Sequence, residues 1–262
     1  AVESFYNDNE VGFQLGERLK DINDLERLIS KVAVGKINPR EIVQLKRTLV
    51  QLDPIKELVA SQNSSVLKRI STQINPCEAL LETIKNTLHE DPAIQIGKGK
   101  VINDGVDKEL DELRAIAFSG KDFLNQIQQR EIERTGITSL KISFNNVFGY
   151  YIEVRNTHKD KVPEEWIRKQ TLVSAERYIT EELKEYESKI LGAEEKIYAI
   201  EARLFQDLVY QMADYTQPIQ YNAHLISQLD CLLSFAEIAA QNDYVKPTMN
   251  ESFAIDIKNG RH

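Results

Sequence analysis

Two stretches of sequence with a seven-residue apolar repeat flank a segment, residues 137–180, in which apolar and polar residues alternate. The repeat consists of Leu110, Ala117 and Leu124 before the segment and of Leu183, Ile190, Ile197 and Leu204 after it. Such a heptad is typical of helices that pack along one another. Because the stripes lie on either side of one insertion, antiparallel helices would let each stripe cover the other. We expect two long helices that carry a small β module.

The ends of these two helices are also marked in the sequence. Gly136 is a typical residue just past a helix end, so the first helix is predicted over 107–135. The second is predicted to begin at Ser174 or Thr180 and to end at Asp214, shortly before Pro218. About 30 helical residues rise about 45 Å. A module held at that distance is better suited to reaching a partner than to enclosing a ligand.

The inserted segment is predicted to contain an antiparallel hairpin. The alternating residues are Leu140, Ile142 and Phe144, followed by Tyr150, Ile152 and Val154, with Asn145, Asn146 and Gly149 supplying the turn. A lone hairpin is marginal in water, so it needs a third strand or a covering helix. We expect the strand at 171–173 and the cover at 163–170, with Trp166 and Ile167 facing inward.

The rest of the chain is mostly helical in pattern, which makes the expected fold class mainly α. Helices are predicted at 11–34, 39–52, 55–61, 64–72, 76–88 and 219–241, a loop at 89–106 and a strand at 252–257. The Gly-Lys pairs of the loop lack the spacing of a phosphate-binding loop. We therefore expect a discontinuous helical domain, 1–136 and 181–262, with the module 137–180 inserted.

Charge is placed unevenly along the chain. The 262 residues carry a net charge of −8, whereas residues 137–180 hold seven basic and five acidic residues. Lys and Arg on a projecting module can contact the phosphates of a duplex without reading bases, although a solvated polar face is an equal alternative. The candidate contacts are Lys141, Arg155, Lys159, Lys161, Arg168 and Lys169. Arg177 has acidic neighbours, Glu176, Glu181 and Glu182, and is expected to pair within the protein.

The sequence offers little for other functions. The four histidines have no Cys or His partners at ligand spacing, so no metal site, catalytic residue or cofactor-binding residue is predicted. The aromatic residues of 137–180 are needed for a core and are not assigned to base stacking. Cys77 and Cys231 stand alone, and neither a signal peptide nor an apolar run of about 20 residues occurs. These features predict a cytoplasmic protein without a membrane span, and the first residue, Ala1, suggests a piece of a longer chain.

Several separated motifs resemble one known family. Residues 149–154, 168–172, 175–178 and 182–187 are similar to the clamp and the adjoining lever helix of the MutS DNA mismatch-repair proteins. Residues 24–28, 39–41, 109–114 and 131–136 resemble the lever domain of that family, and 260–262 resemble the residues that lead into its ATPase domain. The resemblance covers nearly the whole chain in the family's order.

The resemblance implies a DNA mismatch-repair fragment in which helical levers link an ATPase domain to clamps that touch the backbone of double-stranded DNA. It also implies that the mismatch reader and the ATPase domain, with its ATP and Mg, lie outside this chain, which is then no enzyme itself. Homodimerisation through the missing domains and a MutL-type partner follow from the same resemblance. One position departs from the family, because Val173 and Ser174 stand where several members have Lys-Asn; Ser174 can still donate to a phosphate. A helical scaffold that binds proteins and not DNA is the alternative.

Overall fold

The computed structural model describes residues 1–145, 147, 149–258 and 260, and the chain divides into two compact units. The first unit comprises Ala1–Ala33, Gln44–Leu81 and Asp214–His262, and the second comprises Val34–Val43 and Glu82–Ala213. Both long helices and the β module therefore belong to the second unit. The predicted division at residues 137 and 180 remains a prediction.

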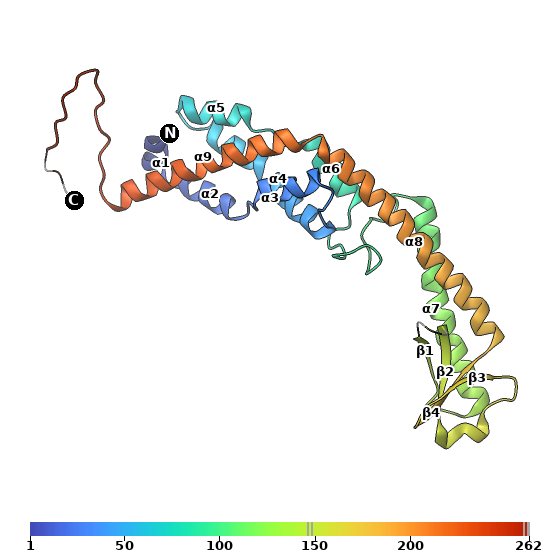
Figure 1. Ribbon diagram of the computed structural model, residues 1–262. Helices are drawn as coiled ribbons and strands as arrows, with labels where there is room; N and C mark the ends of the chain where they lie inside the picture. Colours follow the sequence, from blue (N-terminus) through green and yellow to red (C-terminus); the bar gives the residue numbers. More distant parts are fainter. Residues whose placement is uncertain (146, 148, 259, 261–262) are drawn as a thin grey trace. The chain divides into compact units, whose positions relative to one another are not determined.

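The first unit is helical and is organised around its last helix. Helix α9 (Thr216–Gln241) contacts α1 (Val2–Asn7), α2 (Asn9–Lys20), α3 (Leu25–Ala33) and α5 (Ser65–Gln73), as Figure 1 shows. Its inward stripe, which includes Leu225, Leu229 and Leu233, is buried. Helices α4 (Pro39–Ala60) and α6 (Glu78–Thr87) each have residues in both units.

The single helix predicted over 11–34 is wrong, because α2 and α3 are separate. Between them, the backbone N–H and the side-chain amide of Asn23 both donate to the Oγ1 of Thr48, at 2.9 and 3.1 Å. Asp24 then accepts from the N–H of Arg27 at 2.9 Å, as a residue before a helix start commonly does. The break is thus fixed by Thr48, a residue remote in sequence, which the apolar stripe alone cannot reveal.

One other helix and one strand were also predicted wrongly. Helix α4 passes through Pro54 and ends at Ala60, so the helices predicted at 39–52 and 55–61 form a single helix. A proline inside a helix costs about 3 kcal/mol, and the complete burial of Leu52, Ile55 and Val59 offsets that cost. The residues expected to form a strand at 252–257 form none and are exposed, because the described part of the chain offers them no partner strand.

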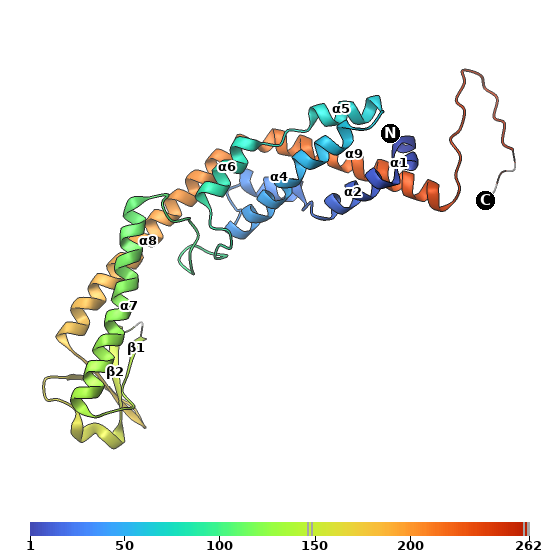
Figure 2. The same ribbon diagram turned by 180° about the vertical axis from the view of Figure 1, so that it is seen from behind.

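The second unit confirms the predicted pair of long helices. Helix α7 (Lys108–Thr135) and helix α8 (Glu181–Ala213) pack side by side, as both views show (Figures 1 and 2). Asp107 caps the start of α7 through the N–H of Leu110 at 3.0 Å, and Gly136 ends it in the left-handed conformation with φ 68°. The mainly helical fold class is therefore correct.

At the start of α7, a buried carboxylate joins α7, α8 and the preceding loop. Glu201 on α8 is 2% exposed, and its Oε1 accepts from the N–H groups of Val101 and Ile102 at 3.2 and 3.4 Å. The same oxygen lies 2.6 Å from the Nη2 of Arg114 on α7. Arg114 also donates to the carbonyl of Ile102 at 2.9 Å and to Asp104 at 3.0 Å. A buried charge is tolerated only with partners of this kind.

The β module at the end of α7 is a four-stranded antiparallel sheet. Its strands are β1 (Lys141–Asn145), β2 (Gly149–Arg155), β3 (Ile167–Thr171) and β4 (Ala175–Ile179), in the order β1-β2-β4-β3, and η1 (Asn156–Lys161) follows β2. The predicted hairpin is thus confirmed. The third strand lies earlier than predicted, a fourth strand pairs between it and β2, and 163–170 is no covering helix. Trp166 is buried as expected, but Ile167 is 50% exposed.

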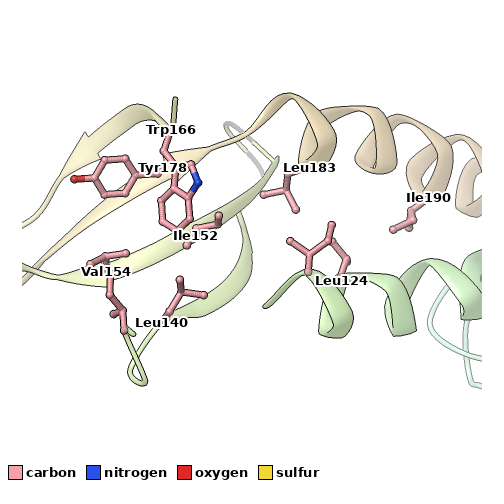
Figure 3. Packing of buried hydrophobic residues seen from close by; sticks show 10 residues of the cluster. Leu124, Leu140, Ile152, Val154, Trp166, Tyr178, Leu183 and Ile190 are labelled. Carbon is pink, nitrogen blue, oxygen red and sulfur yellow. The ribbon is translucent and has the colours of Figure 1, made fainter. Parts of the chain in front are cut away.

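One face of this sheet packs on the helices. Ile142, Ile152 and Tyr178 lie opposite one another across three strands, so their side chains share a face. They join a core with residues of α7 and α8 (Figure 3). A hairpin needs further strands or a covering helix to be stable in water, and here α7 and α8 cover one face of the sheet. The buried members of this core are Leu124, Ile127, Ile137, Leu140, Ile152, Val154, Trp166, Tyr178, Leu183 and Ile190.

Candidate nucleic-acid interface

The two ends of the sheet have different surroundings. At the end formed by the β1–β2 turn, Glu187 of α8 accepts from the N–H of Tyr150 at 3.2 Å. A side chain at Gly149 would collide with this carboxylate, and Gly149 has φ 79°, so glycine is required there. At the opposite end, η1 lies beside the loop between β3 and β4, because the N–H of Asn156 donates to the carbonyl of Ser174 at 3.1 Å. We call this the distal end: Arg155, η1 and residues 172–174.

Most of the candidate cations lie at or next to the distal end. Arg155 is its last β2 residue, and Lys159 and Lys161 are on η1. Lys141 lies opposite Glu153, two residues before Arg155, on the face of the sheet turned away from the core. Each of these side chains is exposed, and among the described residues none of them forms an ion pair within 4.0 Å. They are available to an external anion.

Lys169 is presented by an irregularity in the edge strand. The register between β3 and β4 shifts between Arg168 and Gln170, so Lys169 forms a bulge. A bulge re-aims the side chain of the extra residue. Lys169 is exposed and, within the described chain, also has no ion-pair partner within 4.0 Å.

Arg168 is held inside the module. Its Nη1 lies 3.3 Å from Oε1 of Glu176, while Oε2 of Glu176 accepts the hydroxyl hydrogen of Tyr178. Burial, together with this bond to Glu176, raises the pKa of Tyr178 to about 12, so the hydroxyl keeps its proton. The bond from Tyr178 and the charges of Arg168 and Lys159 hold the pKa of Glu176 below its ordinary value. Sequence reasoning missed this contact, because Arg168 and Glu176 meet only through the register of the hairpin.

The loop between β3 and β4 contains Val173 and Ser174, the two residues that differ from the Lys-Asn of several family members. Val173 is fully exposed at its apex, and Ser174 beside it is also exposed. The side chain of Asn156 donates to the carbonyl of Val173 at 3.0 Å, which ties the loop to η1. Ser174 therefore lies beside η1 and its lysines, whereas Val173 places a fully exposed apolar side chain in the same loop.

Three further arginines, one in the module and two near the end of α7, are paired with glutamates. Arg177 donates to Glu153 at 3.0 Å and covers the ring of Tyr151 at 4.4 Å, so its predicted internal role is confirmed, with a different partner. Near the end of α7, Arg130 pairs with Glu182 at 2.5 Å and Arg134 with Glu165 at 2.7 Å. Neither arginine is free for an external anion.

Two other kinds of site are absent from the described residues. No group of three or more His, Cys, Asp or Glu side chains in that part of the chain is placed to hold a metal ion. No helix there is both long and apolar enough to cross a membrane.

Known proteins resemble the chain in the same region and beyond it. Residues 105–196, which include α7, the sheet and half of α8, match the profile of MutS family domain IV. All of the chain aligns with the DNA mismatch repair protein MutS of Flavobacterium johnsoniae at 60% identity, covering 30% of that protein. The chain belongs to the MutS family. Its MutS relatives from Parabacteroides distasonis and Cytophaga hutchinsonii are each 59% identical over the whole chain, which covers 30% and 31% of their lengths.

The matching region of the family includes the β module. The chain spans about a third of the length of these relatives, and the family profile falls on the module with the exposed cations. These relatives are named for DNA mismatch repair.

Proposed function

We propose that the module 137–180 is a clamp that holds double-stranded DNA by its backbone, at the distal end of the sheet. The observation that carries the proposal is the group of exposed cations, Lys159, Lys161 and Lys169 foremost, that have no carboxylate partner in the described structure. Such side chains release counterions when they neutralise phosphates, and they read no bases.

The long helices are proposed to act as levers between this clamp and the rest of a MutS protein. The paired α7 and α8 join the sheet at one end and the cluster of Glu201 at the other, which supports a stiff connection within the unit. ATP and Mg would act in an ATPase domain outside the chain, which by itself would have no enzymatic activity. A homodimer formed through other domains, a MutL-type partner and a cytoplasmic location are parts of the same proposal and rest on the family alone.

The first prediction concerns the strength and salt dependence of binding. Three or four phosphate contacts give a slope of about −3 to −4 when the logarithm of the binding constant is plotted against that of the salt concentration. Titration of the 262-residue chain with a labelled duplex at several salt concentrations measures the slope. Binding that does not depend on salt would contradict a backbone clamp, and absence of binding here and in the full-length protein would favour a protein-binding scaffold.

A lysine in place of Val173, in the loop between β3 and β4, is expected to strengthen DNA binding. Val173→Lys places a third lysine at the distal end, beside Lys159 and Lys161, on a fully exposed site where no packing is lost. We expect the salt slope to steepen by about 0.9 and affinity to rise about eightfold near 0.1 M salt, for all duplex sequences alike. Val173→Thr, which keeps the branched shape without charge, is the matched control. An unchanged slope for Val173→Lys would show that the loop does not reach the phosphates.

A further inference from the structure

We propose that Glu176 is an internal competitor of DNA: it holds Arg168 as a substitute for a phosphate and thereby keeps the affinity of the clamp low. The inference rests on the proposed DNA contact and concerns its regulation. It assigns a role to an acidic side chain of the module that accepts hydrogen bonds on both of its oxygens, next to the exposed cations.

The geometry places the carboxylate where it can compete. Arg168 on β3 and Glu176 on β4 are joined at 3.3 Å, and 60% of the Arg168 side chain is exposed, against 12% of that of Glu176. The arginine therefore has a solvent-facing side that a phosphate can approach, whereas the glutamate is fixed within the module. A guanidinium binds carboxylate and phosphate with the same donor geometry, so either anion can occupy it.

Tyr178 makes Glu176 a fixed partner. Its hydroxyl donates to the second carboxylate oxygen, and its ring is buried in the core beside Trp166, with 5.9 Å between the ring centroids. Glu176 therefore cannot swing away when DNA arrives, and Arg168 must leave it to bind a phosphate. Lys159 on η1 lies close enough for its charge to act on Glu176 as well. The negative charge of Glu176 thus offsets part of the positive charge at the distal end.

Removing the carboxylate should strengthen binding. In Glu176→Gln the amide oxygen can still accept from Tyr178, but Arg168 is no longer neutralised. We expect duplex affinity of the full chain to rise about eightfold near 0.1 M salt and the salt slope to steepen by about 0.9, which is the effect of one additional phosphate contact. The same titration with labelled duplex measures both quantities.

Two variants separate this role from a general change in charge. Glu165→Gln also removes a paired glutamate of the module, but its partner Arg134 remains held by Glu131 at 2.8 Å, so little gain is expected. In the background of Arg168→Ala, Glu176→Gln should give less than a twofold gain. Circular dichroism of each variant checks that the sheet is retained.

The outcomes distinguish this inference from the function on which it rests. If the unaltered chain binds duplex with the expected salt slope but Glu176→Gln binds no better, Glu176 is not a competitor and the inference is wrong. An equal gain in the Arg168→Ala background, or from Glu165→Gln, overturns it as well. If no variant binds duplex at any salt concentration, the proposed clamp function itself fails.

Discussion

Replacing Glu201 by alanine is expected to lower the free energy of unfolding of the second unit by about 3–5 kcal/mol, because two buried N–H groups lose their acceptor and Arg114 loses its most buried carboxylate partner. Glu201 is the acceptor for Arg114 and for the N–H groups of Val101 and Ile102. Alanine supplies no acceptor, and Val101 and Ile102 are completely buried, so water cannot replace the lost bonds without opening the loop.

Urea unfolding can measure this loss. Circular dichroism follows the helices, and the fluorescence of Trp166, the only tryptophan of the chain, follows the same unit separately. Glu201→Gln is the control, because its amide oxygen can still accept; it should cost about 1–2 kcal/mol, within the range for a weakened buried hydrogen bond. A loss below about 1 kcal/mol for the alanine variant would show that the cluster does not hold the helices to the loop.

Removing three lysines from the module is expected to abolish most duplex binding. Each phosphate contact contributes about 0.9 to the salt slope, so Lys159→Ala, Lys161→Ala and Lys169→Ala together should flatten it by about 2.7 and weaken binding about 500-fold near 0.1 M salt. The side chains are exposed and have no ion-pair partner among the described residues, so stability should be retained.

A matched variant tests whether position or charge is responsible. Lys36→Ala, Lys98→Ala and Lys108→Ala remove the same charge from exposed sites of the same unit, none of them in the module. This variant should keep the salt slope within about 0.5 of the original value, because screening removes the effect of charges beyond about 10 Å. Equal loss in both variants would mean that the net charge of the chain governs binding and that the clamp is not located at the distal end.

The parts of the fold that depend on local sequence were predictable. The heptads and the glycine at 136 predict α7 and α8, and the alternation of apolar and polar residues over 140–154 predicts the β1–β2 hairpin. Contacts between remote residues were not predictable. Thr48 breaks a helix near Asn23, and Glu201 meets the loop about a hundred residues before it, without any sign in the local pattern.

The candidate site shows the same division. The exposed cations were identifiable by residue type and by their position in a polar module, and their contact with DNA remains a prediction. Arg168 required the register of β3 on β4, including the bulge at Lys169, before its pairing with Glu176 could be seen. Charge counts treat these residues alike, whereas geometry separates the available cations from the one already occupied.

Glu187 and Glu201 are two carboxylates of α8 that accept backbone N–H groups from other elements, one from the sheet and one from the loop before α7. They are fourteen residues apart, which is two repeats of the apolar pattern, so they share an azimuth on a helix that follows it. A single inserted residue would turn one of them by about 100° from its partner. Both contacts can consequently be kept only when the length of α8 between them changes by close to a whole number of helical turns, as with seven residues.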